Sequence, residues 1–193
     1  MHGKKNIWVL LVAVGWVAFG ALGLIAQEQN TSGAQPQAPT VQQVEATACG
    51  DFHEKFEAMR DGTHPLAAPV PGKALVYVIS DIAPISPTIR VGMDRRWIGA
   101  NRGGSYTSFY VSPGIHRVCV NWQSIFKRLN KLVAIKEWNA ESGKIYYFRI
   151  QYLVVVVGIN DAYSGLLNLD TVDSGEGQLL LAEYPHSTSK AKK

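Results

Sequence analysis

The chain has 193 residues, of which 47% are hydrophobic and 18% are charged, and its formal net charge is +4. This apolar content excludes a disordered chain, two cysteines are too few for a disulfide-rich miniprotein, and glycine lacks the three-residue period of collagen. Five basic residues lie at the chain ends, which leaves 14 basic against 15 acidic residues in between. That balance excludes nucleic acid as a partner, because phosphate binding needs a basic face.

The first residues have the pattern of an export segment. Two lysines precede Ile7–Ala26, a run without charged residues, and small residues precede an abruptly polar stretch. The expected cleavage points follow Ala26 or Gly23. A run of this length also spans about 30 Å as a helix, so the alternative is a retained membrane anchor. In either form residues 1–26 direct the remaining chain to the periplasm or cell envelope, soluble after cleavage or anchored.

The rest of the chain divides by composition into three parts. Residues 27–48 are rich in Gln, Pro, Ser and Thr, and they bury too little apolar surface to offset the entropy of ordering, so we expect a flexible linker. Residues 49–186 are expected to form a single domain. Residues 187–193 are polar and basic, and we expect a disordered tail.

The domain reads as a series of short strands. Phe52, Phe56 and Met59 recur at helical spacing and predict a short helix at its start. After it, β-branched and aromatic stretches alternate with turn residues, and Asp94-Arg95 is expected to turn a tight hairpin. The expected strands are Lys73–Ile79, Thr88–Met93, Arg96–Ala100, Ser105–Val111, Ile115–Trp122, Leu132–Ala140, Ile145–Val157 and Leu166–Val172.

Short strands with frequent turns predict an all-β fold, a single antiparallel β-sandwich of about seven strands. The last element differs from the others. Asp173 precedes Glu176 by three residues and heads an apolar run, which is the pattern of a capping box. We therefore expect a short C-terminal helix after the last strand.

Cys49 and Cys119 are the only cysteines. In an exported protein an even number of cysteines favours a disulfide, and this one would close a loop worth about 4 kcal/mol in the chain-entropy model. Two unpaired thiols in the core, or pairing between chains, are the alternatives. A catalytic thiol is disfavoured because Cys119 lies within a predicted strand and no suitable histidines accompany it.

Motifs for catalysis, cofactors and metals are missing from the sequence. It has no nucleophile elbow, phosphate-binding loop or zinc motif, so we predict no catalytic, cofactor-binding or metal-binding residues and no enzyme activity. His53 and Glu57 offer two metal ligands at helical spacing, but nothing nearby completes a site. The alternative function is a carbohydrate-active or other hydrolase, whose site would have to assemble from the loop carboxylates Asp81, Asp161 and Asp170.

Two further features bear on binding. Trp97, Trp122 and Trp138 are of a kind that stacks on sugars, but in a sandwich we expect such residues to serve core packing first. The stretch Ile125–Lys131 places three positive charges beside two apolar residues. It suits either contact with an anionic membrane surface or a solvated loop between strands.

Several motifs in order resemble a bacterial envelope family, domain of unknown function 2846, over about residues 49–185. They are Cys49-Gly50, Pro71-Gly72-Lys73-Ala74-Leu75-Val76-Tyr77, Val91-Gly92-Met93-Asp94, Trp97-Ile98-Gly99, Pro113-Gly114-Ile115-His116-Arg117-Val118-Cys119, Asn121-Trp122-Gln123-Ser124 and Gly143-Lys144-Ile145-Tyr146-Tyr147-Phe148-Arg149. A weaker, fold-level likeness is to small β-sandwich modules of bacterial surface proteins. The resemblance implies an envelope location and offers no catalytic residues to carry over.

The sequence thus predicts an exported, non-enzymatic protein of the cell envelope, an interaction or structural β-sandwich module without a cofactor. The expected partner is an envelope protein or a glycan that the sequence does not identify. Residues 7–26 supply the only expected tether to a membrane.

Overall fold

The computed structural model describes residues 49–82, 87–157 and 162–192, together with positions 38, 40 and 43. All of these residues belong to one compact unit. The predicted signal or anchor segment Ile7–Ala26 and nearly all of the predicted linker lie outside the described residues. Within the described part, no helix is both long and apolar enough to cross a membrane.

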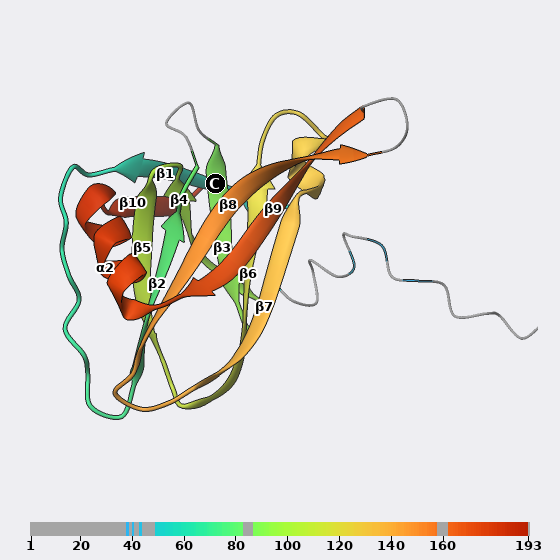
Figure 1. Cartoon of the computed structure of the whole chain (residues 1–193). Coiled ribbons are helices and arrows are strands. Elements are labelled where there is room, and N and C mark those ends of the chain that lie inside the picture. The colour runs from blue at the N-terminus through green and yellow to red at the C-terminus, as the bar shows by residue number, and fades with distance from the viewer. Residues whose placement is uncertain are drawn as a thin grey trace, which may run out of the picture. The chain divides into compact units, whose positions relative to one another are not determined.

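The described residues form ten strands and one α-helix (Figure 1). The α-helix α2 (Ser174–Glu183) follows β9, and a short 3-10 helix η1 (Leu129–Lys131) precedes β7. The strands are β1 (Phe56–Arg60), β2 (Ala74–Ser80), β3 (Thr88–Met93), β4 (Arg96–Arg102), β5 (Ser105–Val111), β6 (Gly114–Gln123), β7 (Val133–Ala140), β8 (Ile145–Val157), β9 (Ala162–Val172) and β10 (Ser187–Ala191).

Two four-stranded sheets make the body of the fold, with strand orders β5-β2-β8-β9 and β4-β3-β6-β7. β2 and β8 are parallel, with Leu75 opposite Ile145, whereas the other pairs are antiparallel. The prediction of an all-β, sandwich-like fold agrees with this arrangement, but the prediction of purely antiparallel pairing among about seven strands is wrong. The alternation of side chains along a strand is the same for both directions of pairing, so the sequence pattern did not distinguish them.

The main core lies between the two sheets, where alternate residues of the strands meet. Phe148 and Ile150 of β8 and Val118 of β6 are fully buried there. Trp138 packs edge-on against Phe148, with 4.9 Å between ring centroids. The aromatic side chain therefore serves packing, as the sequence analysis expected. The buried members of this core are Ala74, Val76, Val78, Ile89, Val91, Val111, Val118, Val120, Ala140, Phe148, Ile150, Leu167 and Leu169.

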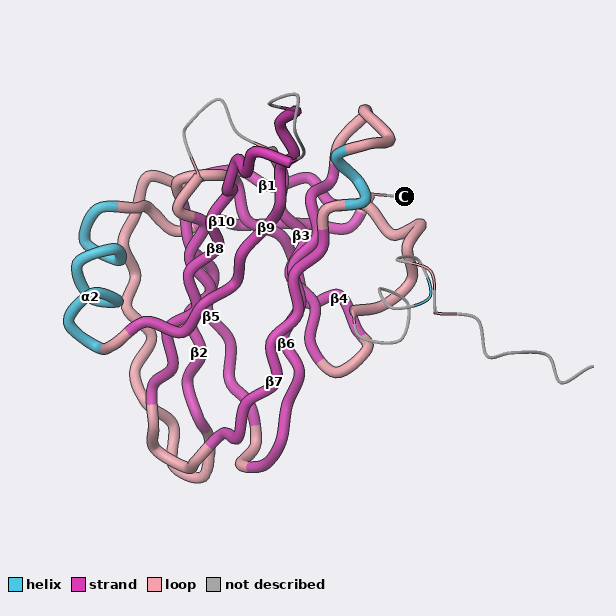
Figure 2. The backbone as a smooth tube through the Cα atoms, turned by 45° about the vertical axis from the view of Figure 1, so that its right-hand side comes forward, coloured by secondary structure: helices cyan, strands magenta, loops and turns pink. Residues whose placement is uncertain are grey.

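Helix α2 covers the outer face of the first sheet (Figure 2). Leu180 and Leu181 pack with Tyr77 and Tyr147, whose rings are stacked at 5.6 Å between centroids. A Cβ at Gly177 would lie 2.3 Å from the Tyr147 ring, so only glycine allows the helix to approach this closely. Glycine is unfavourable within an isolated helix, but at position 177 it permits the docking of α2.

Helix α2 begins at the predicted cap. The side chain of Asp173 accepts hydrogen bonds from the backbone N–H groups of Gly175 and Glu176. We expect Asp173→Ala to lower the free energy of unfolding by about 1 kcal/mol, because two N–H groups of the first turn lose their acceptor. Urea denaturation followed by circular dichroism measures this, with Asp173→Asn, which retains an acceptor, as the control. Equal stability of Asp173→Ala and the natural chain would contradict the cap's role.

The outer face of the second sheet is covered by residues 49–55 and by the antiparallel pair β1 and β10. Two predictions are wrong here. The segment from Phe52 to Met59 is not a helix, because Phe56 and Ala58 are buried at the two-residue spacing of a strand. Ser187–Ala191 is not a disordered tail but the strand β10.

Serine hydroxyls hold β10 in place. The hydroxyl of Ser189 accepts from the backbone N–H of Ala100, and that of Ser187 accepts from the N–H of Arg102 and donates to the carbonyl of Met59. This segment is fixed by hydrogen bonds instead of apolar burial. A prediction based on hydrophobic pattern therefore had no signal for it.

Candidate functional site

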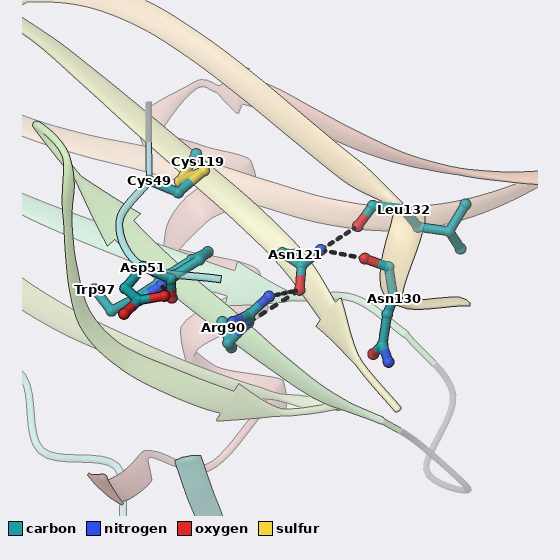
Figure 3. The surroundings of a disulfide bond; sticks show 8 residues. All are labelled: Cys49, Asp51, Arg90, Trp97, Cys119, Asn121, Asn130 and Leu132. Atoms are coloured by element: carbon teal, nitrogen blue, oxygen red, sulfur yellow. Dashed lines mark hydrogen bonds between the residues drawn. A yellow bond between two sulfur atoms is a disulfide. The ribbon is translucent and has the colours of Figure 1, made fainter. Parts of the chain in front are cut away.

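We call residues 49–55 the N-terminal segment. Its first residue, Cys49, meets Cys119 of β6 on the outer face of the second sheet (Figure 3). The sulfur atoms of Cys49 and Cys119 are at disulfide distance, their Cα atoms are 5.6 Å apart, and both residues are fully buried. This is the predicted pairing. A Cβ at Gly92, opposite Cys119 on β3, would lie 2.8 Å from the Cys119 sulfur. Glycine at this position therefore leaves the room that the sulfur needs.

A buried arginine lies on the same face of the sheet (Figure 3). Arg90, on β3, is 3% exposed, and its Nε donates to Oδ1 of Asn121 at 3.0 Å. Its Nη1 donates to the carbonyl oxygens of Phe52, at 2.9 Å, and Glu54, at 2.8 Å. The guanidinium carbon lies 4.3 Å from the centroid of the Trp97 ring, in cation–π contact. Arg90 therefore ties the N-terminal segment to β6.

Asn121 extends this network to the connection between β6 and β7 (Figure 3). We call residues 124–131 the basic loop. The amide nitrogen of Asn121, which is fully buried, donates to the carbonyl oxygens of Asn130 and Leu132. The Asn130 side chain in turn accepts from the backbone N–H of Ser124 and donates to its carbonyl, both at 2.6 Å. The two asparagines thus fix both ends of the basic loop.

This fixed loop presents apolar side chains to solvent. Ile125 is 91% exposed and Phe126 is 65% exposed, although the backbone of Phe126 is held by hydrogen bonds from Leu129 and to Ser124. Lys127 and Lys131 of the same loop are also exposed. Fixed backbone with exposed large apolar residues is unfavourable for a free protein in water, which makes the loop a candidate contact surface.

A second group of exposed apolar residues lies near the end of β8 and the start of β9, next to the connection between these two strands. Leu153 and Leu166 are opposite each other in the ladder, and they are 38% and 37% exposed. Val154 is 60% exposed. Tyr152 contacts Trp122, at 5.1 Å between ring centroids, and Trp122 precedes the basic loop. We call Leu153, Val154 and Leu166 the hairpin patch; Leu153 and Leu166 share one face of the ladder, and Val154 lies on the other.

The connection between β6 and β7, which forms the basic loop, and the segments of β8 and β9 next to their connection lie at the same end of the sandwich in both views (Figures 1 and 2). The contact between Trp122, just before the basic loop, and Tyr152, just before Leu153, links the two. Together they form what we call the apolar–basic end. The other exposed large apolar side chains are dispersed over the described residues, for example Leu66 between β1 and β2, Ile115 at the start of β6 and Leu179 on helix α2. The apolar–basic end is thus the candidate functional site.

Three histidines of the domain, His64, His116 and His186, make side-chain hydrogen bonds to distant segments. Nδ1 of His116 lies 2.6 Å from a carboxylate oxygen of Asp94, and its Nε2 lies 2.7 Å from the carbonyl oxygen of Ser112. Asp94 and Arg95 have positive φ angles of 47° and 72° and form the predicted tight turn between β3 and β4. His116 therefore joins this turn to the one before β6.

Both partners of His116 accept hydrogen bonds, so the doubly protonated ring fits best. Burial opposes the charge, but the hydrogen bonds to Asp94 and Ser112 outweigh it and raise the pKa of His116 above its ordinary value. A raised pKa in the folded state stabilises the protein below the pKa of the unfolded chain, about 6.5, and this stabilisation is lost as the pH rises through the folded pKa.

We therefore expect the difference in unfolding free energy between the natural chain and His116→Gln to be larger at pH 5.5 than at pH 8.5, both values chosen to bracket the ordinary histidine pKa of about 6.5. Urea denaturation at the two pH values measures it. The control is His53→Gln, at an exposed position. Its difference in unfolding free energy from the natural chain should be the same at both pH values. A pH-independent effect of His116→Gln would contradict the stabilising charge.

The carboxylates considered for a hydrolytic site are held by neighbours. Oδ1 of Asp81 accepts the hydroxyl hydrogen of Tyr184 at 2.6 Å, and burial together with this aspartate raises the pKa of the Tyr184 hydroxyl. Asp170, on β9, accepts from the side-chain amide of Asn168. Strand β8 lies between β2, which Asp81 follows, and β9. The third carboxylate, Asp161, lies outside the described residues.

The described residues contain no group of three or more His, Cys, Asp or Glu side chains placed to hold a metal ion. His53 and Glu57, which the sequence offered as two ligands, do not share a helix, because Glu57 lies on strand β1. Its carboxylate is 3.4 Å from the ammonium group of Lys190 on β10.

This chain was compared with protein families, curated proteins and solved structures. No family model, no curated protein and no solved structure matches it. The resemblance to domain of unknown function 2846 therefore stays a prediction that rests on the motifs alone.

Sequence reasoning found part of the candidate site. The mixture of apolar and basic residues in Ile125–Lys131 indicated a membrane-facing loop as one of two alternatives. The hairpin patch was missed, because Leu153 and Val154 belong to an apolar run in β8 that reads as a buried strand, and Leu166 belongs to the next predicted strand. The only signal for it was the length of that run, since 13 residues in β8 exceed the seven of β2, which is buried along its whole length.

Proposed function

We propose that this chain is an exported, non-enzymatic protein of the bacterial cell envelope, an interaction module that makes contact through its apolar–basic end. The observation that carries the proposal is the exposure of Ile125 and Phe126 on a loop whose ends are fixed by Asn121 and Asn130. These hydrogen bonds fix the backbone of the loop, so the two side chains stay exposed to water, which is unfavourable for apolar groups. A contact that buries them explains this arrangement.

Two observations support export. The cysteine pair at disulfide distance is typical of proteins that leave the reducing cytoplasm. The charge and hydropathy of the first 26 residues are those of a signal peptide or an anchor. Both fit an envelope location, as does the family resemblance of the sequence motifs.

A role in binding, as opposed to catalysis, is supported by how the chemically capable side chains are used. His116 joins two turns, and His186 lies 2.7 Å from a carboxylate oxygen of Asp61. That hydrogen bond, with others from Thr63, lowers the pKa of Asp61 to about 2. These groups stabilise connections between strands, which is a sufficient reason for their presence.

The proposal is tested by expressing the complete chain in a bacterium and fractionating the cells. We expect the protein outside the cytoplasm, with an intact mass two hydrogen atoms lower than after reduction. To test the surface, a photo-crosslinking phenylalanine analogue replaces Phe126 in one variant and Ile115 in a control, which is 73% exposed at the opposite end of β6.

We expect covalent adducts, to protein or to lipid, from position 126 and not from position 115. A cytoplasmic chain with two free thiols would overturn the assignment to the envelope. Equal labelling from both positions would overturn the assignment of the contact surface.

A further inference from the structure

We infer that the apolar–basic end docks on the surface of an anionic phospholipid bilayer, an inference that rests on the proposed function and names its partner. The site combines two apolar groups with exposed lysines at one end of the domain. Such a combination matches a membrane interface, where apolar side chains enter the acyl boundary and cations remain at the headgroups.

The geometry of the basic loop suits shallow insertion. Ile125 and Phe126 are adjacent and more than half exposed, and the loop that carries them begins and ends on neighbouring strands, β6 and β7. The segments of β8 and β9 next to their connection lie at the same end (Figures 1 and 2), and they carry the exposed residues Leu153, Val154 and Leu166. Two apolar contacts from separate hairpins are able to orient the sandwich on a surface, whereas one contact leaves it free to tilt.

The charges select the kind of surface. From Asn121 to Ile135 the sequence contains lysines and an arginine but no acidic residue. Lys127 directly follows the apolar pair and Lys131 ends the short helix η1 of the same loop, so both exposed lysines are placed to meet the headgroups when that pair inserts. A second copy of this chain would bring like charges together across a symmetric contact. An anionic bilayer complements the same charges at every orientation in its plane.

Trp122 precedes the basic loop, Tyr152 precedes Leu153 on β8, and the two rings contact each other. Trp122 is half-buried, and Tyr152 is 36% exposed. Aromatic side chains of this type, with an apolar ring and a polar edge, favour the boundary between the acyl chains and the headgroups. Two aromatic rings of this type next to the basic loop and the hairpin patch therefore suit a surface that meets the headgroups.

The inference is tested on the chain as export leaves it, purified from the expressing bacterium. It is mixed with phosphatidylcholine vesicles that contain or lack phosphatidylglycerol. Hydrogen exchange of the backbone amides in residues 124–132 reports contact at this loop, even if residues 7–26 also insert. We expect slower exchange with the anionic vesicles, and a return to the free rate in neutral vesicles and at high salt.

Four variants separate the contributions. Lys127→Gln and Lys131→Gln together should weaken binding to anionic vesicles about 25-fold, since each lysine near such a surface contributes about fivefold. The double change Ile125→Ser and Phe126→Ser should weaken it at least about tenfold. The matched controls, Lys144→Gln and Ile115→Ser, alter exposed residues at other positions and should leave it unchanged.

The outcomes distinguish this inference from the proposed function. Exchange that does not respond to anionic vesicles, with protein adducts from position 126, overturns lipid as the partner and keeps the contact surface. An equal response to neutral vesicles overturns the role of charge. No response to vesicles and no adduct from position 126 overturns both the inference and the proposed contact surface.

Discussion

Replacing Cys49 and Cys119 with alanine is expected to lower the free energy of unfolding by about 4 kcal/mol. The two residues are 70 positions apart, so their bond removes much of the freedom of the unfolded chain. Both are fully buried, and the bond holds the start of the domain on β6. Urea denaturation of the double variant and of the natural chain measures the difference.

The natural chain in a thiol reductant is the matched comparison, because it loses the bond and keeps the side chains. We expect reduction to account for most of the 4 kcal/mol that the chain-entropy model gives. Exchange should also become faster in residues 52–54, which Arg90 and the disulfide hold from two sides. Identical denaturation curves with and without reductant would show that the cysteines do not bond.

Most strands of the two central sheets followed from the sequence, because their stability comes from regular alternation. Ser105–Val111 and Ile145–Val157 have the predicted bounds. The turn at Asp94-Arg95 was also predicted, since a two-residue connection between alternating stretches favours a tight hairpin. Where apolar burial and turn chemistry decide the structure, local sequence carried enough information.

Elements that depend on distant partners were not predicted. β1 has only two buried apolar residues, and β10 is held by its ladder with β1 and by hydroxyl groups that bond to β4. Neither strand has a pattern that is stable by itself. Each forms because the other covers the same face of the second sheet, and that pairing joins residues more than a hundred positions apart.

The candidate site was predicted in the same partial way. The composition of Ile125–Lys131 showed what the loop could contact, and that is a local property. Its fixed shape depends on Asn121 and Asn130, whose role became visible only when β6 and β7 were paired. Asparagine in a strand otherwise indicates only low strand propensity, which concealed its use as a clamp.

Arg90→Lys is expected to lower the free energy of unfolding by at least about 3 kcal/mol, although the charge is retained. The guanidinium group donates in several directions, to Asn121 and to the carbonyls of Phe52 and Glu54, and it stacks on Trp97. A lysine ammonium is a compact group that cannot make this fork, so buried acceptors lose their donors. Arg96→Lys, at an exposed position on β4, is the control and should change stability by less than about 0.5 kcal/mol.

The same substitution tests whether the hydrogen bonds between Arg90 and Asn121 support the basic loop. If Arg90 and Asn121 act as one unit, the stability effects of Arg90→Lys and Asn121→Ala should not add, and the double variant should be more stable than the sum predicts. Each single change should also speed hydrogen exchange in residues 124–131, because Asn121 holds the carbonyls of Asn130 and Leu132. The contradicting result is additive stability effects together with unchanged hydrogen exchange in the basic loop of the Arg90→Lys variant. Arg90 would then hold only the N-terminal segment and would not support the apolar–basic end.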